Sequence, residues 1–420
     1  MSDNKHQMTM TADLERTTVA KGPGDASVHP DTLHLADFCR QRQAAFAKIL
    51  REKKIDVAFF EDTEGRRDPS IRYFTGQPGD ALLALTADGE SVLIPWDVNM
   101  ARQMATVDSI LPYTDFNRSA PTALAQLLAR MPAHSQGHSL QVELPPSLPY
   151  PSYATYQMAV SQALAAAHPA TAVHLLCRED GVHQDAVAMR AIKDQYEISC
   201  IKRAAAITDQ LILVLEQRVR EGSITTELDA ALLIERECRA AGCEGTGFET
   251  LAAGPARSFG IHCFPPYTAG EFPAQGLSIL DFGVVVEGYT SDVTLTFAKG
   301  PLTAEQQQQL NLVQAAYEAA LELYKPDIPI KKPAQKVDEV FAAAGRAMPH
   351  SLGHGYGLEA HEWPTVRPSQ PDTACFKPGM VVTLEPGLYD PAMGGCRLEN
   401  DILITEEGNQ VLTSARIILL

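Results

Sequence analysis

Residues 184–420 alternate twice between helix-rich and strand-rich stretches, and this order restricts the folds open to the chain. Residues 184–241 carry apolar side chains at helical spacing, and residues 246–299 read as strands punctuated by Gly and Pro. Residues 302–346 return to a helical pattern, and residues 350–420 return to strands. The succession of helices, strands, helices and strands indicates an internal repeat of architecture without an obvious repeat of sequence.

The first helical stretch predicts one long helix or a helix pair with a single apolar side. That side would bury Ile192, Ile198, Ile201, Ala205, Ile207 and Leu211. A second helix is expected to begin at a capping box formed by Thr226 and Asp229. The sequence LTAEQQQQL offers a similar cap for the helices that follow residue 302.

Residues 31–182 alternate between helical and β-like runs, which predicts a separate α/β domain. A helix is expected to open at the cap residue Asp31. The β-like runs are VAFF, IRYF, ALLALT, SVLIP and LQVEL. The region contains no phosphate-binding loop and no GxGxxG motif, so it offers no chemistry of its own. Residues 1–30 are expected to form a flexible tail, and a second domain to span residues 183–420.

Charge and cysteine usage exclude several classes of protein. The formal net charge of -17, from 35 basic and 52 acidic residues, argues against a nucleic-acid or anionic-membrane surface. No apolar run reaches the roughly 18 residues of a transmembrane helix, and the polar N-terminus lacks the apolar core of a secretory signal. The eight cysteines form no CxxC pair and are expected to be buried thiols of a reducing compartment. These features predict a cytoplasmic protein.

The segment ILDFGVVVEGYTSDVTLTF predicts two strands joined by a turn at Glu287 and Gly288. With that turn, Gly283 lies opposite Asp292, and Asp281 projects from the same face as Gly283. The two carboxylates are then diagonal neighbours, and Gly283 is expected to keep the space between them open. The alternative for this hairpin taken alone is a half-exposed sheet with solvated acids.

A second pair of acids follows in the last strand-rich stretch. MVVTLEPGLY is an apolar strand that ends in Glu385, directly before a Pro-Gly turn. GGCRLENDILI places Arg397, Glu399 and Asp401 on one side of a strand. A carboxylate buried in such an apolar run is costly unless it is paired or bound to a metal. The alternative is a Glu exposed at a turn.

Three histidines lie in HSLGHGYGLEAHEWP, a segment too rich in glycine for a helix and without the HExxH zinc spacing. In an extended segment His350 and His354 share a face, and the glycines allow the backbone to approach a ligand closely. His361 follows seven residues after His354. His262, in SFGIHCFPP, is a fourth candidate site residue.

Five of these residues form the oxygen-rich ligand set that two neighbouring divalent cations require: Asp281, Asp292, His354, Glu385 and Glu399. Two cations that share a water favour hydrolysis, because they stabilise hydroxide near neutral pH. Such a ligand set suits manganese, and it tolerates cobalt or zinc.

Four stretches, DFG…GYTSD, HSLGHGYGLEAHE, LEPGLY and GGCRLEND, occur in the same order as the signatures of a known family. They resemble the pita-bread metallopeptidases of the aminopeptidase P, prolidase and creatinase type, and the resemblance covers nearly everything beyond the tail. It implies an α+β protein with a creatinase-like N-terminal domain and a catalytic pita-bread domain of two ααββ halves. It also implies a homodimer.

The resemblance further implies a role for each candidate residue. The five ligands are those named above, with Asp292 and Glu399 bridging both metals. His262, His350 and His361 match substrate-site histidines of the family. Arg397 matches a basic position that contacts the substrate and orients the second Glu.

The implied reaction is hydrolysis of an Xaa-Pro peptide bond by a hydroxide that bridges the two metals. Glu385 would accept the proton of the attacking water, and His361 and His262 would stabilise the oxyanion or protonate the leaving nitrogen. The substrate would be a small peptide with proline at its second position, held by His350 and nearby apolar side chains. Whether only dipeptides or also longer peptides are cleaved is left open.

Two alternatives to a peptidase remain at this point. One is a non-peptidase of the same fold, either a metal-dependent C–N hydrolase of small metabolites or a sulfonium lyase. The other is a binding protein without metal. Two positions depart from the family pattern, which commonly has Arg at Leu295 and Asp at Asn400. Neither is a ligand, and both are expected to bear on substrate recognition.

Overall fold

The computed structural model describes residues 33–131, 139–146 and 148–420. The first part of the described chain contains the following helices and strands: α1 (Leu35–Lys53), β1 (Val57–Asp62), α2 (Ser70–Thr75), β2 (Ala81–Thr86), β3 (Ser91–Pro95), α3 (Val98–Met104), β4 (Ser109–Ile110), the 3-10 turn η2 (Tyr113–Phe116), α4 (Ala120–Arg130), β5 (Ser139–Glu143), α5 (Tyr150–Ala167), β6 (Ala172–Leu176) and α6 (Val182–Ala191).

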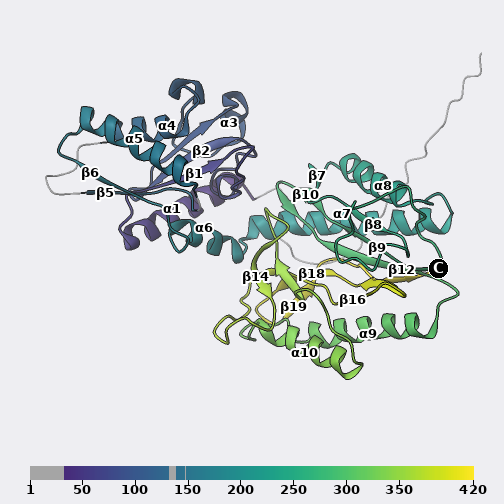
Figure 1. The fold of residues 1–420 in the computed structure, drawn as a ribbon. Helices are drawn as coiled ribbons and strands as arrows, with labels where there is room; N and C mark the ends of the chain where they lie inside the picture. The colour runs from purple at the N-terminus through teal and green to yellow at the C-terminus, as the bar shows by residue number, and fades with distance from the viewer. Residues whose placement is uncertain (1–32, 132–138, 147) are drawn as a thin grey trace, which may run out of the picture. The chain divides into compact units, whose positions relative to one another are not determined.

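These strands form one mixed sheet in the order β4-β3-β2-β1-β5-β6. β2 is antiparallel to β1 and β3, whereas the other neighbours are parallel. Alternate residues of β1 serve both faces: Val57 and Phe59 pack with α4 and α5, and Ala58 and Phe60 pack with α1 and α6 (Figure 1). Because both faces are covered, β1 is apolar throughout its first four residues. The expected α/β domain is confirmed.

One predicted strand of this domain is a helix. The run IRYF lies in α2, which follows Pro69 with a helical φ of -65° and ends at Gly76 with a φ of 80°. Phe74 packs on Phe46 of α1, with ring centroids 4.9 Å apart. Proline and glycine therefore delimit a single buried helical turn in a run whose composition favours strand. The cap expected at Asp31 lies outside the described residues.

The rest of the chain repeats two helices followed by strands. The first half comprises α7 (Gln195–Arg220), α8 (Glu227–Ala240), β7 (Gly245–Thr246), β8 (Leu251–Ala253), β9 (Gly276–Phe282), β10 (Val284–Val286), β11 (Tyr289–Thr290) and β12 (Val293–Lys299). The second half comprises α9 (Ala304–Leu321), α10 (Lys331–Ala343), β13 (Gly353–Gly355), β14 (Glu362–Val366), β15 (Val381–Leu384), β16 (Gly387–Asp390), β17 (Gly394–Arg397), β18 (Asn400–Ile404), β19 (Asn409–Val411) and β20 (Ile417–Leu419).

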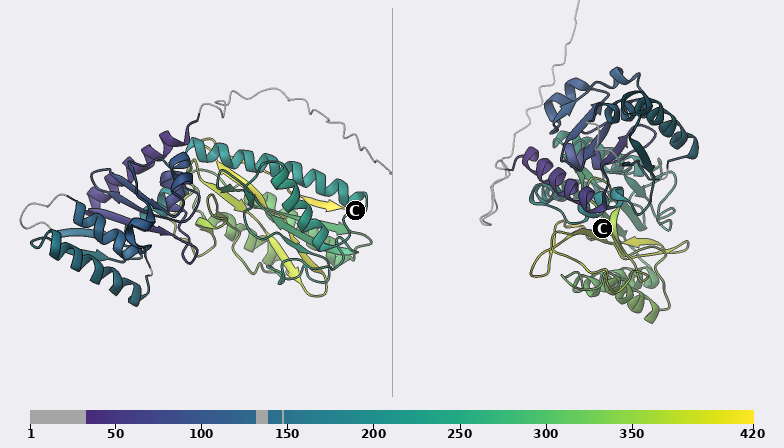
Figure 2. Two further views of the ribbon diagram at one scale, coloured as in Figure 1. Left: turned by 90° about the horizontal axis from the view of Figure 1, so that it is seen from above. Right: turned by 90° about the vertical axis from the view of Figure 1, so that its left-hand side faces the viewer.

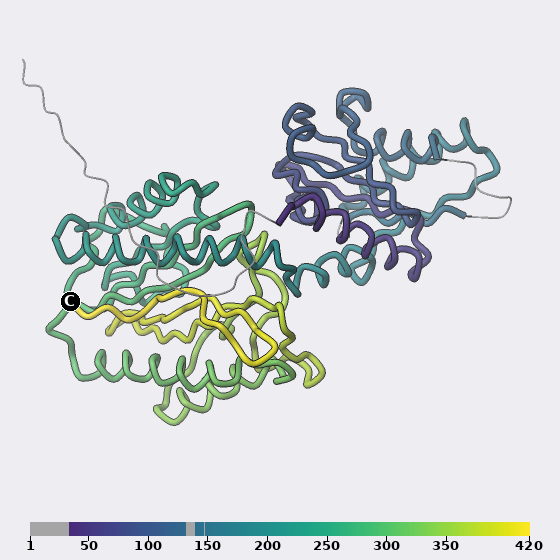
Figure 3. Tube along the Cα trace, turned by 180° about the vertical axis from the view of Figure 1, so that it is seen from behind, coloured from purple at the N-terminus to yellow at the C-terminus, as the bar shows by residue number. Residues whose placement is uncertain are grey.

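Strands lie between the two helix pairs, with α7 and α8 on one side and α9 and α10 on the other (Figures 1 and 3). The larger sheets have the orders β20-β12-β9-β8 and β14-β13-β15-β18-β19. The last strand, β20, pairs in parallel with β12 of the first half, so the end of the chain ties the halves together. Seen from above, α7 runs lengthwise over the strands (Figure 2). This arrangement confirms the duplicated ααββ architecture.

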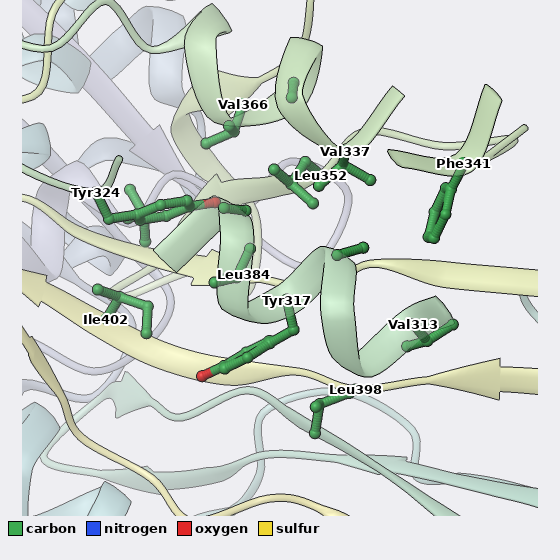
Figure 4. Packing of buried hydrophobic residues seen from close by; sticks show 14 of the residues in the cluster. Val313, Tyr317, Tyr324, Val337, Phe341, Leu352, Val366, Leu384, Leu398 and Ile402 are labelled. Atoms are coloured by element: carbon green, nitrogen blue, oxygen red, sulfur yellow. The ribbon is translucent and has the colours of Figure 1, made fainter. Parts of the chain in front are cut away.

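Each helix pair covers its own apolar cluster. Tyr317 of α9 and Phe341 of α10 belong to one buried cluster with Leu384 and Ile402 of the strands (Figure 4). The first half has an equivalent cluster between α7, α8 and the strands β9 and β12. The amphipathic helices predicted from the sequence are therefore the outer layers of the domain.

The long helical stretch after residue 182 is a helix pair, α6 and α7, broken at residues 192–194. Asp194 begins α7 with a capping box, and the backbone N–H of Lys193 donates to the Gly379 carbonyl at 2.8 Å. Ile192 lies at the break with 44% of its surface exposed, so its expected burial is wrong. The predicted capping boxes at Thr226 and Thr303 are both present.

The structure also bears on the predictions made for the cysteines and for membrane-spanning helices. All eight cysteines are free thiols, and five of them are buried. Among the described residues, no helix combines the length and the apolar character needed to cross a membrane.

Candidate metal centre and active-site cavity

The first acid pair stands on the predicted hairpin. Glu287 and Gly288 form its turn, with φ angles of 52° and 85° that define a two-residue turn of the I′ type. In β9 and β12, Asp281 lies opposite Thr294. The same register, carried to the gap between the strands, places Asp292 opposite Gly283. The predicted diagonal placement of the two acids is confirmed.

The expected role of Gly283 is wrong. A Cβ at this position would lie 1.9 Å from the carbonyl oxygen of Ser291, so the glycine admits backbone and does not open space between the acids. The ladder is interrupted there, because the N–H of Val284 donates to the Ser291 hydroxyl. The N–H of Asp292 leaves the hairpin and donates to Oδ2 of Asp401 at 3.2 Å.

The second acid pair stands at a similar interruption. β16 and β17 pair Gly387 with Arg397, and β15 and β18 pair Leu384 with Asn400. The register is the same on both sides of the gap, and it places Glu385 directly opposite Glu399. Glu385 precedes Pro386, which has no N–H to continue a ladder. The N–H of Glu399 instead donates to the Thr294 carbonyl at 3.2 Å, across the two halves of the domain.

His354 of β13 meets acids from both pairs. Its Nε2 lies 3.6 Å from Oδ2 of Asp292 and 3.5 Å from Oε1 of Glu385. Asp292, His354 and Glu399 are buried, and each offers one ligand atom within 4.8 Å of the others. Oδ1 of Asp281 is buried and accepts no hydrogen bond. The structure thus brings together the residues predicted as metal ligands.

This cluster has more negative charge than its own side chains can neutralise. Burial, and then the neighbouring Asp281, raise the pKa of Glu399 to about 7. Burial, then the proximity of Glu399, holds the pKa of Asp292 and of Glu385 well above the usual range. Burial lowers the pKa of His354 to about 4, so its imidazole is neutral at pH 7. Neutral imidazole and crowded carboxylates are the donors that divalent cations prefer, so the residues present fit a divalent metal centre.

Arg397 is fully buried beside the acids and joins them to a set of neutral groups. Its guanidinium donates to Oδ2 of Asp281 at 2.5 Å, to the Tyr389 hydroxyl at 2.8 Å and to the Thr294 hydroxyl at 2.8 Å. Its Nε is 3.9 Å from Glu399, whose Oε2 accepts from the Thr294 hydroxyl at 2.6 Å. Arg397 therefore acts on Glu399, the second Glu, through the Thr294 hydroxyl, whereas it contacts Asp281 directly.

The other three histidines line the same cavity, which has a volume of about 760 Å³. His350 lies 3.1 Å from the Tyr389 hydroxyl and 3.8 Å from Glu385, and burial lowers its pKa to about 4. The ring of His361 lies 4.2 Å from that of His354. His262 is on an exposed loop of the cavity wall.

The two positions that depart from the family pattern are absent from the described wall of the cavity. Leu295 is fully buried in the apolar cluster under α7 and α8. The Asn400 side chain donates to the Ala415 carbonyl at 3.0 Å and accepts from Thr413 and from the Ala415 N–H. No cavity contact of Leu295 or Asn400 supports the expected role in substrate recognition, and both side chains instead pack within the domain.

Sequence reasoning missed three groups at the site. Tyr389 links His350 to Arg397, and Thr294 links Arg397 to Glu399. The period-two pattern of the hairpin, which puts Thr294 on the same face as Asp292, was the available signal for the threonine. Trp363, which is 39% exposed at the cavity wall, had no such signal.

Comparisons with known proteins agree with this geometry. Residues 199–406 match the family model of metallopeptidase family M24, and residues 42–179 match the creatinase/prolidase N-terminal domain. An uncharacterized peptidase of Staphylococcus saprophyticus is 36% identical over 237 residues, which is 55% of this chain and 65% of that protein. The Xaa-Pro dipeptidase of Pyrococcus horikoshii is 35% identical over 229 residues, 54% of this chain and 63% of that protein. The matches thus span less than two thirds of either relative.

A solved structure covers more of the chain. The crystal structure of the prolidase from Pyrococcus horikoshii superposes with a TM-score of 0.75 at 25% identity. The superposition includes 90% of this chain and 100% of that one. The whole described fold, including the α/β domain, therefore has a counterpart in a solved structure.

Proposed function

Because the chain belongs to metallopeptidase family M24, we propose that it hydrolyses the peptide bond that precedes proline at the second position of a small peptide. The observation that carries this proposal is the buried group of Asp292, His354 and Glu399, whose ligand atoms lie within 4.8 Å of one another in a cavity of about 760 Å³ that Asp281 and Glu385 also line. The names of a relative and of a structural neighbour, an Xaa-Pro dipeptidase and a prolidase, support the choice of substrate.

Two divalent cations, Mn²⁺ in the first instance, would be held by Asp281, Asp292, His354, Glu385 and Glu399. Asp292 from the first half and Glu399 from the second half would each contact both ions. When bound, such cations lower the pKa of water toward neutrality and polarise a carbonyl oxygen.

Glu385 is the residue placed to accept a proton from the attacking water. One of its oxygens lies 3.5 Å from His354 and the other 3.8 Å from His350, at the cavity wall.

His361 and His262 would act on the opposite side of the scissile bond. Burial lowers the pKa of His361, so its neutral ring can donate one hydrogen bond to a developing oxyanion. His262 lies on the exposed wall, where it can hand a proton to the leaving nitrogen of proline. The proline ring would rest against His350 and the apolar wall, which includes Phe248 and Trp363.

The test is a substrate panel on protein stripped of metal and reloaded with Mn²⁺. Gly-Pro, Ala-Pro and a longer Xaa-Pro peptide are expected to be cleaved before proline, whereas Pro-Gly is expected to remain intact. Turnover of the dipeptides alone would assign a dipeptidase, and turnover of the longer peptide would assign an aminopeptidase. No cleavage of any Xaa-Pro substrate by the metal-loaded protein would refute the proposal.

A further inference from the structure

A buried group of charges lies directly beside His361 and takes no part in the chemistry above. Glu362 is the next residue in the chain, and its side chain exposes only 3% of its surface. The side chains of Arg190 and Lys193 around it expose 3% and 1%. A carboxylate so deeply buried needs compensation by cations and hydrogen bonds, so its contacts define what it does.

The carboxylate of Glu362 folds the loop 357–361 around itself. Its Oε1 accepts from the backbone N–H of Leu358 at 3.1 Å and, more weakly, from that of Glu359 at 3.3 Å. A Cβ on Gly357 would come within 3.0 Å of this carboxylate, so the loop passes against it closely. The side chain of Glu362 therefore holds the backbone of the loop that ends in His361.

Two cations from the segment between α6 and α7 complete the group. Arg190 donates to Oε1 of Glu362 at 2.9 Å, and Nζ of Lys193 donates to Oε2 at 3.0 Å. Burial opposes ionisation of Glu362, but Lys193 and Arg190 together lower its pKa below the usual value. Arg190 also binds Glu359, a half-exposed residue of the same loop, so it holds the loop at two points.

The group touches the cavity without reaching the metal ligands. Arg190, Glu359 and Glu362 all line the cavity that holds His361 and His354. Within the described residues, the hydrogen bonds of Glu362 join it to Arg190, Lys193, Leu358 and Glu359, and none joins it to a predicted metal ligand. Its influence on the site must pass through the loop and His361.

We propose that Glu362, fixed by Arg190 and Lys193, is a positioning residue that sets the place of the His361 imidazole in the cavity. The proposal rests on the proposed function, because it assigns His361 a part in the reaction. It makes the α6–α7 segment, which carries no predicted site residue, a working part of the active site.

The experiment uses E362Q, which keeps the shape and the acceptor oxygen but removes the charge that both cations bind. We expect kcat per bound Mn²⁺ to fall about 100-fold, since small misplacements of a catalytic group have effects of this size. KM is expected to change less than about threefold and the metal content not at all. E362D, which restores the charge on a shorter stem, should recover part of kcat.

An independent readout comes from Trp363, one of only two tryptophans in the chain. In a W96F background it is the sole tryptophan and it adjoins Glu362. E362Q is expected to shift its emission even in metal-free protein, because the loop relaxes. K193M, which removes one cation and leaves Arg190 in place, provides a milder variant if E362Q folds poorly.

A matched control is E143Q, which alters another buried carboxylate, in β5, that is also paired with an arginine, Arg178, and does not line the cavity. It should leave kcat and Trp363 emission unchanged. The proposal is overturned if E362Q and K193M retain both kcat and the Trp363 emission, or if they lose metal in proportion to activity. If the wild type cleaves no Xaa-Pro peptide, the proposed function fails, and the emission shift alone decides whether Glu362 shapes the loop.

Discussion

The two halves of the catalytic domain place their acids by strand pairings that are related but not identical. In the first half Asp281 and Asp292 are diagonal neighbours on one hairpin, whereas the register of the second half sets Glu385 directly opposite Glu399. Both ladders are interrupted where the acids stand. The freed N–H of Asp292 donates to Asp401 of the second half, and that of Glu399 donates to Thr294 of the first. Each half therefore fixes one acid of the other.

The halves differ more in their histidines. The second half contributes His350, His354 and His361, and the first half contributes only the exposed His262. Each half contributes two of the four carboxylates, but most of the histidines come from the second half. The duplication thus accounts for an even set of acids, whereas three of the four cavity histidines come from the second half.

The largest expected effect comes from removing one acid of each half. D292N and E399Q should both abolish metal binding and peptide cleavage, because each acid is proposed to contact both ions. Metal content by mass spectrometry and Ala-Pro turnover measure the effect. E287Q in the first turn and D390N in the second hairpin are acid-to-amide controls that should retain both properties. Retained binding in only one of the two ligand variants would show that the halves are not equivalent.

R397M tests the link between the halves and should have the next largest effect. Asp281 loses a partner at 2.5 Å, and Thr294 loses the group that orients it toward Glu399. Loss of such supporting contacts typically weakens metal affinity or activity by about 10- to 100-fold. Calorimetric titration with Mn²⁺ measures it, and affinity within twofold of wild type would contradict the role assigned to Arg397.

G283A tests the interruption in the first hairpin. The added methyl meets the backbone of Ser291 at 1.9 Å, so the free energy of unfolding should fall by about 1–3 kcal/mol. G387A, in the second hairpin, meets the side-chain hydroxyl of Tyr389 at 2.6 Å instead of backbone, and should cost less. G65A, which has no atom within 4 Å of its Cβ, is the control. Urea denaturation compares the three, and equal losses would remove the distinction between backbone and side-chain crowding.

The smallest effect concerns a buried acid that belongs to neither pair. Burial raises the pKa of Glu197 to about 7 despite Arg42 at 3.7 Å, and its usual value is 4.5. The folded state then binds more protons than the unfolded state between these values, so stability falls as pH rises from 4.5 to 7. E197Q should lessen this fall, because it removes the group that titrates. Parallel pH profiles of stability for the two proteins would contradict it.

The local sequence pattern was enough to predict the placement of site residues that are close to one another both in sequence and in space. The turn at Glu287 and the period-two parity placed Asp281 and Asp292 without further information. The second pair depends on pairings between β15 and β18 and between β16 and β17, which no short-range rule specifies. Its convergence on the first pair was predicted from the repeated architecture and the family resemblance, and from no local rule.

The errors have physical causes of the same kind. IRYF has a strand-like composition, but Pro69 and Gly76 confine it to a helical turn. Gly283 was taken as open space, whereas close backbone packing occupies it. The expected action of Arg397 on Glu399 is found, but it passes through Thr294, and the nearer partner of Arg397 is Asp281. The contact between Arg397 and Asp281 spans 116 residues, and local propensity does not contain such tertiary contacts.

The central claim is that acids from both halves hold two ions in one centre. Crystals soaked in Mn²⁺ and measured at the manganese absorption edge test it most directly. Two anomalous peaks a few ångströms apart are expected, with Asp292 and Glu399 in contact with both. A single peak, or peaks bound by the acids of one half alone, would contradict this account.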